Sequence, residues 1–518
     1  MVKELLTQRR ILYLILIASF LIPLLSISIY QSFTYDEAAA IYNSWLELNG
    51  KHAFVDYFNG LQKPPAIIWI SVPITFLFGN TFTTLLAMRV LSVLINVLTT
   101  WLVYLIALKL FKNHDKKEKI ALVAALFFGI SSLVNSVAGV LFTEPFTTFL
   151  MSLAFLIYLS DHKHKFLFSG IMIGAAGMFR QSPIIFAALL FLFILAYDRK
   201  DLLDKCSKYL AGLLIGFSPF LIYLFATNSF EAFFRSIITY QSYHNPVTPA
   251  VWMESALPKI NAIINSFRWD TYLLLLLGIG LIFYMIKGRI GLKNLKSPSD
   301  KGYLFILLWL AVYSISFIFT GALFRHYLYE IMVPVVLITA KIFFDLGIDK
   351  KRIVGYLFIL LVIFSVFGGV VYPLRIVDNT DWYLYQEFEK YNPETIFTDN
   401  PSILFLFGKT TDFYIWKEGE TAYEKSGLDK LLGDRGMADA IAYANEHEPD
   451  IVYVYEIRDT FDNENYTKFS VTGLPSHSEF RYLLYIEIRK IVHHTLSIDK
   501  GIVPYENAYY VHNRLLEN

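Results

Sequence analysis

Long apolar runs recur along the first 372 residues of the chain, and short polar or basic segments separate them. Most of these runs approach the length of about 17 to 25 residues that crosses the hydrocarbon core of a bilayer as a helix. They predict roughly eleven membrane-spanning helices. The predicted spans are 11–30, 84–111, 120–140, 145–160, 165–179, 183–197, 208–227, 271–287, 303–320, 327–346 and 352–372.

After Pro373 the pattern changes to regular charges and short apolar runs. Four of these runs, 395–398, 413–416, 451–455 and 508–511, are typical of strands, and 428–444 and 479–491 are typical of helices. The alternation predicts an α/β domain. We therefore expect a transmembrane domain over 1–372 and a soluble domain over 373–518.

The composition agrees with this division, since 55% of the residues are hydrophobic and only 17% are charged. The predicted fold class is a polytopic α-helical membrane protein with a C-terminal extracytoplasmic α/β domain. A net charge of +1 and the lack of a basic tract give no indication of nucleic-acid binding. The first helix has no small-residue cleavage site after it, so it is interpreted as a retained anchor.

The positive-inside rule orients the spans. Basic segments lie at 1–10, 112–119, 161–165, 198–208, 287–301 and 349–352. All of them fall on the cytoplasmic side if the apolar run 64–79, which is short for a span, lies at the membrane surface or re-enters it. The prediction is an integral protein of the cell membrane with its N-terminus in the cytoplasm and its C-terminal domain outside.

In this topology, acidic and cationic side chains gather at the outer ends of the helices. They are Asp36, Glu37, Lys63, Glu144, Arg180 and the pair Arg325-His326. Carboxylates beside several cations are suited to activating a hydroxyl nucleophile and neutralising a departing phosphate. Ionisable groups near lipid are costly, and they commonly mark a functional site.

Each of these residues also has a structural interpretation. Thr34 and Glu37 fit a capping box at the start of a helix, and Glu144 is favoured there by the helix dipole. Adjacent helical residues point about 100° apart, so the two acids are not expected to share one role. With Glu37 as the helix cap, Asp36 is the acid expected to act in catalysis. Lys63 can snorkel to the interface, Arg180 and Arg325 can anchor helix ends, and His326 can be an interfacial aromatic.

Several motifs together resemble the polyprenyl-phosphate-sugar-dependent glycosyltransferases of the GT-C fold, the group with protein O-mannosyltransferases and the lipid A aminoarabinose transferase. The resemblance covers about residues 10–350. The motifs are Tyr35-Asp36-Glu37, Asn49-Gly50, Phe58-Asn59-Gly60-Leu61-Gln62-Lys63-Pro64-Pro65, Trp69, Leu77-Phe78-Gly79, Arg89, Thr143-Glu144-Pro145, Gly170 to Arg180, Phe324-Arg325-His326-Tyr327 and Pro334.

The resemblance implies a role for individual residues. Asp36 matches the general base that acts on the acceptor, Lys63 the lysine that meets the lipid phosphate, and Glu144 a second acid. Arg325 matches a further phosphate or sugar contact. In the lipid A transferase an arginine follows the Asp-Glu pair by two residues, but Ala39 stands here, so that enzyme's donor and acceptor are not transferred to this chain.

We accordingly predict two catalytic residues, Asp36 and Glu144. The predicted substrate-binding residues are Glu37, Lys63, Arg180, Arg325, His326 and Tyr327. Neither a metal nor a cofactor is predicted, because no ligand cluster with metal spacing is evident.

The predicted reaction moves a single sugar from a polyprenyl- or dolichyl-phosphate donor to a hydroxyl of a protein, lipid or glycan acceptor, with inversion. A phosphate is a competent leaving group, so the reaction needs a base and cations but no general acid. The alternative is a multi-pass transporter, which would place ionisable groups near mid-helix and show an internal repeat. Neither feature is clear in the sequence.

Overall fold

The computed structural model describes most of the N-terminal two thirds of the chain and parts of the remainder. In the first part the described residues are 2–26, 34–55, 64–236, 260–286 without 262 and 268–269, 298–319 and 325–348. Beyond it they are 359–360, 363, 384–385, 388–398, 401–409, 447, 449–453, 465–471, 507–512 and 515–516.

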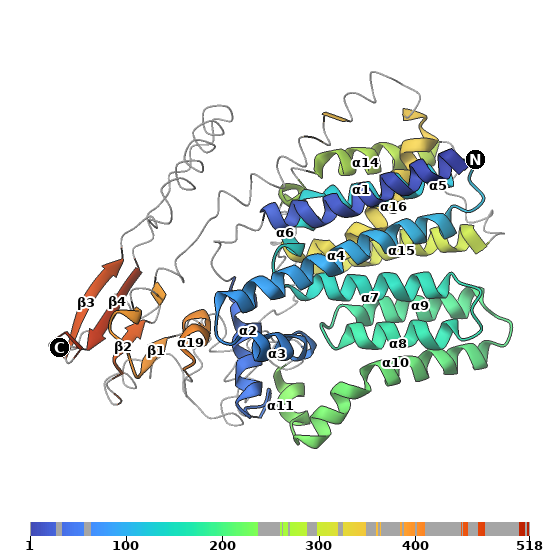
Figure 1. Ribbon diagram of the computed structural model, residues 1–518. Coiled ribbons are helices and arrows are strands. Elements are labelled where there is room, and N and C mark those ends of the chain that lie inside the picture. Colours follow the sequence, from blue (N-terminus) through green and yellow to red (C-terminus); the bar gives the residue numbers. More distant parts are fainter. Residues whose placement is uncertain are drawn as a thin grey trace.

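A bundle of apolar helices forms the body of the described chain (Figure 1). It contains α1 (Val2–Ser26), α4 (Phe82–Leu110), α5 (Lys117–Ile130), α7 (Thr143–Tyr158), α8 (Lys165–Gly177), α9 (Pro183–Tyr197), α10 (Leu202–Ala226), α14 (Thr271–Ile286), α15 (Pro298–Phe319) and α16 (Tyr329–Asp345). A helix lies over every predicted span except 352–372, which is mostly outside the described residues. The apolar runs therefore located the helices, most of them to within a few residues.

Length and hydropathy single out the helices that can cross a bilayer. Among the described residues, Thr7–Leu24, Phe82–Leu110, Leu202–Ala226 and Arg325–Asp345 meet both conditions. The described parts of α3 (Ala66–Phe78), α8, α9, α14 and α15 that are apolar are shorter. The structure is thus a membrane protein built on helices, and the total of eleven crossings stays a prediction.

The predicted single span 120–140 is not one straight helix. It consists of α5 and the short α6 (Ser132–Ala138), which meet at an angle of 56° around Ser131. The break is stabilised because the Ser131 hydroxyl and the backbone N–H groups of Ser132 and Leu133 donate to the buried carboxylate of Asp270, at 2.9–3.0 Å. These donors are free of helical partners at a helix start, and Asp270 satisfies them.

Helices α8 and α10 approach each other more closely than ordinary side chains permit. Gly170 and Gly174 on α8 face Gly212 and Gly216 on α10, and a Cβ atom on any of the four would lie 2.1–2.3 Å from a backbone carbonyl oxygen of the partner helix. Small residues at this spacing allow two backbones to pack directly in a membrane. The contact holds α8 in place and thereby the turn that follows it.

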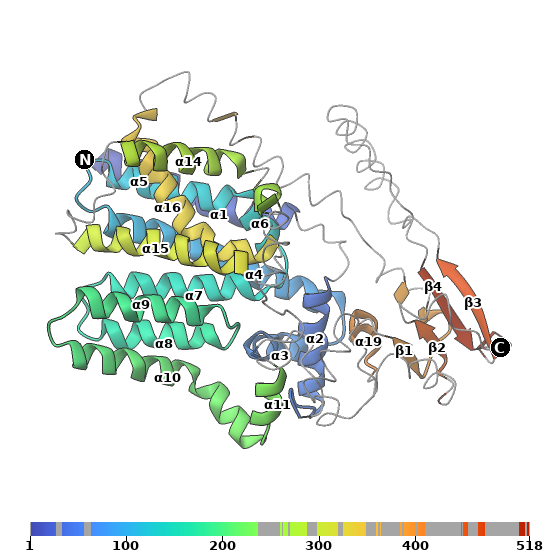
Figure 2. The same cartoon turned by 180° about the vertical axis from the view of Figure 1, so that it is seen from behind.

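Two helices lie at one end of the bundle, outside its parallel array. Figures 1 and 2 both show α2 (Tyr35–Leu48) running across the direction of the bundle helices, with α3 beside it. Helix α2 packs against α3 and α4. The predicted surface helix after Asp36 and the short apolar run 64–79 correspond to these two elements, and whether α3 enters the membrane stays a prediction.

The described part of the C-terminal region contains a four-stranded sheet in the order β1-β2-β4-β3. The strands are β1 (Ile396–Thr398), β2 (Ile451–Tyr453), β3 (Tyr466–Val471) and β4 (Asn507–His512). Strands β1 and β2 pair in parallel, whereas β4 pairs antiparallel with both β2 and β3. Three strands were predicted, β3 was not, and the predicted elements 413–416, 428–444 and 479–491 lie outside the described residues.

The sheet region is connected to the bundle through α19 (Pro401–Phe407), which packs against α2. Leu404, Phe405 and Leu406 are buried and share one apolar cluster with Ala38, Ile41 and Tyr42 of α2. Hydrophobic burial of this kind fixes α2 from both sides, because the bundle covers its other face. Helix α2 is therefore the element on which the two parts of the chain meet.

Candidate active site

The start of α2 is a complete capping box. The Thr34 side chain accepts a hydrogen bond from the Glu37 N–H at 3.4 Å, and the Thr34 N–H donates to Glu37 Oε2 at 3.0 Å. Two backbone donors that the helix itself leaves unpaired are satisfied in this way. The structural interpretation of Glu37 as the cap is confirmed, and its predicted contact with substrate stays a prediction.

Glu37 is also fully buried and paired with an arginine of α4. Arg89 donates from Nε to Glu37 Oε1 and from Nη2 to Oε2, both at 2.8 Å, in the two-pronged geometry that is strongest for this pair. The backbone N–H of Leu141 donates to the same Oε1 at 2.9 Å. Through these contacts Glu37 joins α2, α4 and the segment before α7.

Asp36 has a different environment from its neighbour. Its side chain is partly exposed, whereas that of Glu37 has no exposed surface. Residues one apart on a helix point about 100° apart, so fixing Glu37 in the interior directs Asp36 to another side of α2. Of the two acids, Asp36 is the one that an incoming molecule can approach.

A second ionic cluster lies where α7, the α8–α9 turn and α16 meet. The Arg180 guanidinium contacts both Glu144, in the first turn of α7, and Glu330, in the first turn of α16. Its Nε lies 3.7 Å from Glu330 Oε1, while Nη1 contacts Glu144 Oε1. Both carboxylates are almost completely buried, at 0% and 1% exposure, and Arg180 is 9% exposed. We name Glu144, Arg180 and Glu330 the arginine cluster.

Aromatic rings from the single-turn helix η4 (Arg325–Leu328) cover this cluster. The guanidinium carbon of Arg180 lies 4.0 Å from the centre of the Tyr327 ring, which is a cation–π contact. His326 stacks on Phe142 with ring centres 4.4 Å apart, and its Nε2 is 3.8 Å from Glu144 Oε1. Tyr327, His326 and Arg325 are all partly exposed, so η4 forms the accessible side of the cluster.

The Glu37–Arg89 pair and the arginine cluster are close in space because one short segment joins them. Leu141 bonds to Glu37, and Glu144 follows Leu141 by three residues, which span at most about 11 Å when fully extended. The turn before Arg180 is linked as well, since the Ala66 N–H donates to the Met178 carbonyl at 3.1 Å. The acids of α2 and the arginine cluster therefore occupy the same end of the bundle.

The structure brings together most of the residues predicted for the site. Glu144, Arg180, His326 and Tyr327 are in mutual contact, Glu37 is connected to them through Leu141, and Asp36 is its neighbour. Lys63 lies outside the described residues. Arg325 begins η4 beside His326.

Sequence reasoning missed the roles of two residues, Arg89 and Glu330. Arg89 was present in the motif set, but its partner Glu37 is 52 positions away. Glu330 is the lone acid at the start of an otherwise apolar helix, and an ionisable residue in such a segment is a usual sign of a functional role.

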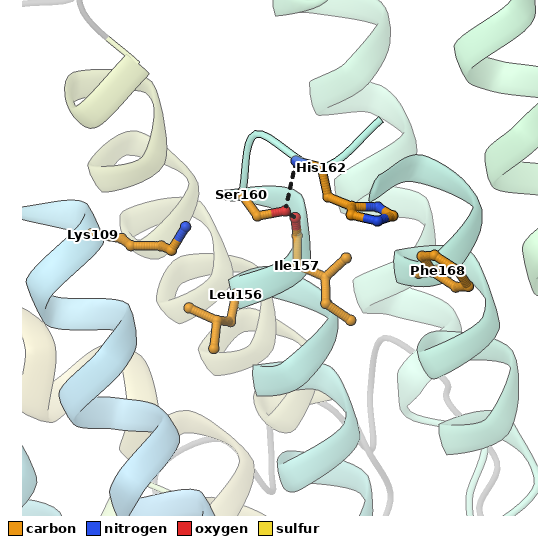
Figure 3. Close-up of a pocket in the computed structure, with 6 residues that line it drawn as sticks. All are labelled: Lys109, Leu156, Ile157, Ser160, His162 and Phe168. Atoms are coloured by element: carbon orange, nitrogen blue, oxygen red, sulfur yellow. Dashed lines mark hydrogen bonds between the residues drawn. The ribbon is translucent and has the colours of Figure 1, made fainter. Parts of the chain in front are cut away.

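A hollow of about 300 Å³ lies at the C-terminal end of α7. Figure 3 shows the side chains that line it. Its lining includes Lys109, Ile157, Ser160, His162 and Phe168, and the His162 N–H donates to Ser160 Oγ at 3.3 Å. The hollow has no carboxylate in its lining and lies at the last turn of α7, whereas Glu144 is in the first turn. It is therefore separate from the candidate site.

Within the described residues, no three His, Cys, Asp or Glu side chains gather in a way that would hold a metal ion.

Comparison with known proteins gives matches at the level of a family model and of fold. The family model described as dolichyl-phosphate-mannose-protein mannosyltransferase matches residues 62–223. ArnT from Cupriavidus metallidurans, solved with undecaprenyl phosphate bound, matches with a TM-score of 0.61 and 11% identity, covering 96% of this chain and 97% of that protein. The chain has a GT-C fold. The resemblance to polyprenyl-phosphate-sugar-dependent glycosyltransferases is confirmed.

The oligosaccharyltransferase of Archaeoglobus fulgidus, solved with Zn and sulfate, matches with a TM-score of 0.45 and 13% identity over 85% of this chain and 68% of that one. No curated protein matches the sequence. The family match includes Glu144 and Arg180, and the GT-C likeness to ArnT extends over nearly the whole chain.

Proposed function

We propose that this protein is a membrane glycosyltransferase that moves a single sugar from a polyprenyl- or dolichyl-phosphate donor to an acceptor hydroxyl at the outer membrane face, with inversion. The observation that carries the proposal is the meeting of the Asp36-Glu37 pair and the arginine cluster at one end of a GT-C bundle. The fold is that of ArnT, which binds undecaprenyl phosphate. The family match to a dolichyl-phosphate-mannose-dependent mannosyltransferase points to the same donor chemistry.

Asp36 is proposed as the general base. Asp36 is partly exposed and its backbone is held by the capping box and the Glu37–Arg89 pair, so its orientation is set before a substrate arrives. It would take the proton of the acceptor hydroxyl while the hydroxyl oxygen attacks the anomeric carbon. The bond to the phosphate oxygen breaks on the opposite side, which inverts the configuration at that carbon.

The leaving polyprenyl phosphate develops negative charge that cations must stabilise. Lys63 and Arg325 are proposed for this role, and Arg325 is accessible at the start of η4. Glu144 is proposed as the second acid, next to the sugar. His326 and Tyr327 offer rings and polar atoms at the accessible side of the arginine cluster, which suits contact with a sugar.

The distribution of buried charge favours an enzyme over a transporter. In the described part of the bundle, the buried charged side chains are those of Glu37, Arg89, Glu144, Arg180, Asp270 and Glu330. All except Asp270 belong either to the Glu37–Arg89 pair or to the arginine cluster, which both lie at the α2 end of the bundle. Asp270 caps α6. A transporter site would instead be expected near the bilayer midplane. We also propose that the N-terminus is cytoplasmic and that the α2 end faces outward.

Release of polyprenyl phosphate tests the proposed reaction. Purified protein is incubated with a panel of polyprenyl-phosphate sugars and host membranes as acceptor, and free lipid phosphate is measured. Replacing the base by Asp36→Asn should lower the rate by about 100-fold or more, within the range for general-base catalysis. The matched control is Glu118→Gln at the start of α5, an acid away from the α2 end. No release by folded wild-type protein from any donor would contradict the proposal.

A further inference from the structure

Glu330 is a buried carboxylate to which the proposed reaction assigns no step. It has 1% exposure and stands in the first turn of α16, where Ile331, Met332, Val333 and Pro334 follow it. Burying a carboxylate is costly even when it is paired, and an apolar residue would normally be more favourable at such a position. Its presence therefore calls for a function that an uncharged side chain does not perform.

The contacts of Glu330 are concentrated on the turn between α8 and α9. Ser182 Oγ donates to Glu330 Oε1 at 2.6 Å, and Arg180 Nε lies 3.7 Å from the same oxygen. Tyr313 of α15 holds the turn from the other side by donating to the Ser182 carbonyl at 3.0 Å. Glu330 thus contacts two side chains of the turn, those of Ser182 and Arg180, while Tyr313 holds its backbone.

Glu330 also reaches the helix that carries the second acid. Thr147 Oγ1, one turn after Glu144 on α7, lies 3.3 Å from Glu330 Oε1 and 3.0 Å from the Glu144 carbonyl oxygen. The guanidinium of Arg180 is therefore held between two carboxylates from different helices, with the Tyr327 ring against its face. An arginine held on two sides by buried anions has its charge compensated within the protein.

We propose that Glu330 is a positioning residue that directs Arg180 onto Glu144 and keeps Arg180 engaged with carboxylates. Arg180 then shapes and stabilises the Glu144 carboxylate and is not the cation that binds the donor phosphate. The assignment rests on the proposed function, which it refines by separating the arginine cluster from the lipid-phosphate site. The cations for the phosphate are left to Lys63 and Arg325.

The first test compares sugar transfer with lipid-phosphate binding in Glu330→Gln. Glutamine retains an oxygen that accepts from Ser182 and Thr147 but lacks the charge that orients Arg180. We expect kcat to fall by about 10- to 100-fold, the loss typical of a misplaced catalytic group. The Kd for undecaprenyl phosphate should stay within about threefold of the wild-type value, which corresponds to a change in binding free energy of less than half of that for a tenfold change in Kd.

Asp345→Asn is the matched control. It removes an acid at the other end of the same helix, where Asp345 pairs with Lys341 and His114. Its kcat and its Kd for undecaprenyl phosphate should both equal those of the wild type. Two outcomes would overturn the proposal: a kcat in Glu330→Gln equal to that of the control, or a loss of undecaprenyl phosphate binding as large as the loss of kcat.

Arg180→Lys provides a second variant if Glu330→Gln does not fold. Lysine keeps the charge but has no planar fork with which to contact two carboxylates at once. The expected result is again a lower kcat with little change in undecaprenyl phosphate binding. A Kd for undecaprenyl phosphate weakened by about tenfold would instead make Arg180 a phosphate ligand and overturn the proposal.

A thermal double-mutant cycle tests the contact without any substrate. Glu330→Gln, Arg180→Gln and the double variant are unfolded in detergent, and coupled residues should give a non-additive shift in Tm of about 2 °C or more. Additive shifts would overturn the proposal. If wild-type protein neither transfers sugar nor binds lipid phosphate, the proposed function fails, and this cycle still decides whether Glu330 positions Arg180.

Discussion

Replacing Arg89 by methionine removes the charge that compensates the buried Glu37 carboxylate. Glu37 would lose the two hydrogen bonds of 2.8 Å from Nε and Nη2 and keep those from the Leu141 N–H and from Thr34. Breaking a buried ion pair from one side costs about 3–5 kcal/mol. Because several donors remain, we expect the free energy of unfolding to fall by about 3 kcal/mol, at the lower end of that range.

The measurement is unfolding by SDS titration of detergent-solubilised protein for wild type, Arg89→Met, Glu37→Gln and the double variant. Each single variant should be destabilised, because each leaves one buried partner without its counter-charge. The double variant removes both charges, so its loss should be smaller than the sum of the two by at least about 1.5 kcal/mol. Sugar transfer should also fall in both single variants, since Glu37 sets the position of Asp36.

Two results would refute this reasoning. The first is a loss below about 1 kcal/mol in Arg89→Met, which is the level of an exposed ion pair. The second is strict additivity in the double variant, because residues in direct contact are expected to couple. Either result would mean that the buried pair does not fix the start of α2.

Two further predictions concern packing. Gly212→Leu should destabilise the protein by at least about 3 kcal/mol in the same titration, because the new Cβ would lie 2.2 Å from the Leu167 carbonyl oxygen. Gly278→Leu is the matched control and should be near neutral, because a Cβ at Gly278 has no atom within 4 Å. Phe405→Ala should loosen α19 from α2 and lower the free energy of unfolding by about 3–5 kcal/mol. The readout is faster proteolysis of the C-terminal region, and a rate of proteolysis equal to that of the wild type would contradict the prediction.

Features that depend on neighbouring residues could be predicted from the sequence. The capping box at Thr34 and Glu37 needs only four consecutive residues, and it is present. The division of the apolar stretch 166–197 into two helices follows from its two basic ends and from the segment Arg180 to Pro183 that interrupts its middle, and α8 and α9 separate there. The positions of the helices could be predicted for the same reason, because an apolar run and its basic flanking residues are contiguous in the sequence.

Features that depend on distant residues were not accessible. The bend between α5 and α6 relies on Asp270, which lies 139 positions beyond Ser131. The apolar run 120–140 by itself therefore predicts a single helix. Glu37 looked like a cap or a ligand, but its pairing with Arg89 shows only in three dimensions. Glu330 was visible as an isolated acid, yet only the folded bundle places it against Arg180.

The contact between α19 and α2 has a consequence for the order in which the parts of the chain assemble. A chain emerges from the ribosome with its amino end first, so α2 reaches the membrane on the order of tens of seconds before α19 is synthesised. During that interval the apolar face of α2 that Phe405 later covers stands open. That face of α2 therefore stays uncovered until the carboxyl end of the chain has been made, although the capping box and the Glu37–Arg89 pair at the start of α2 can already form.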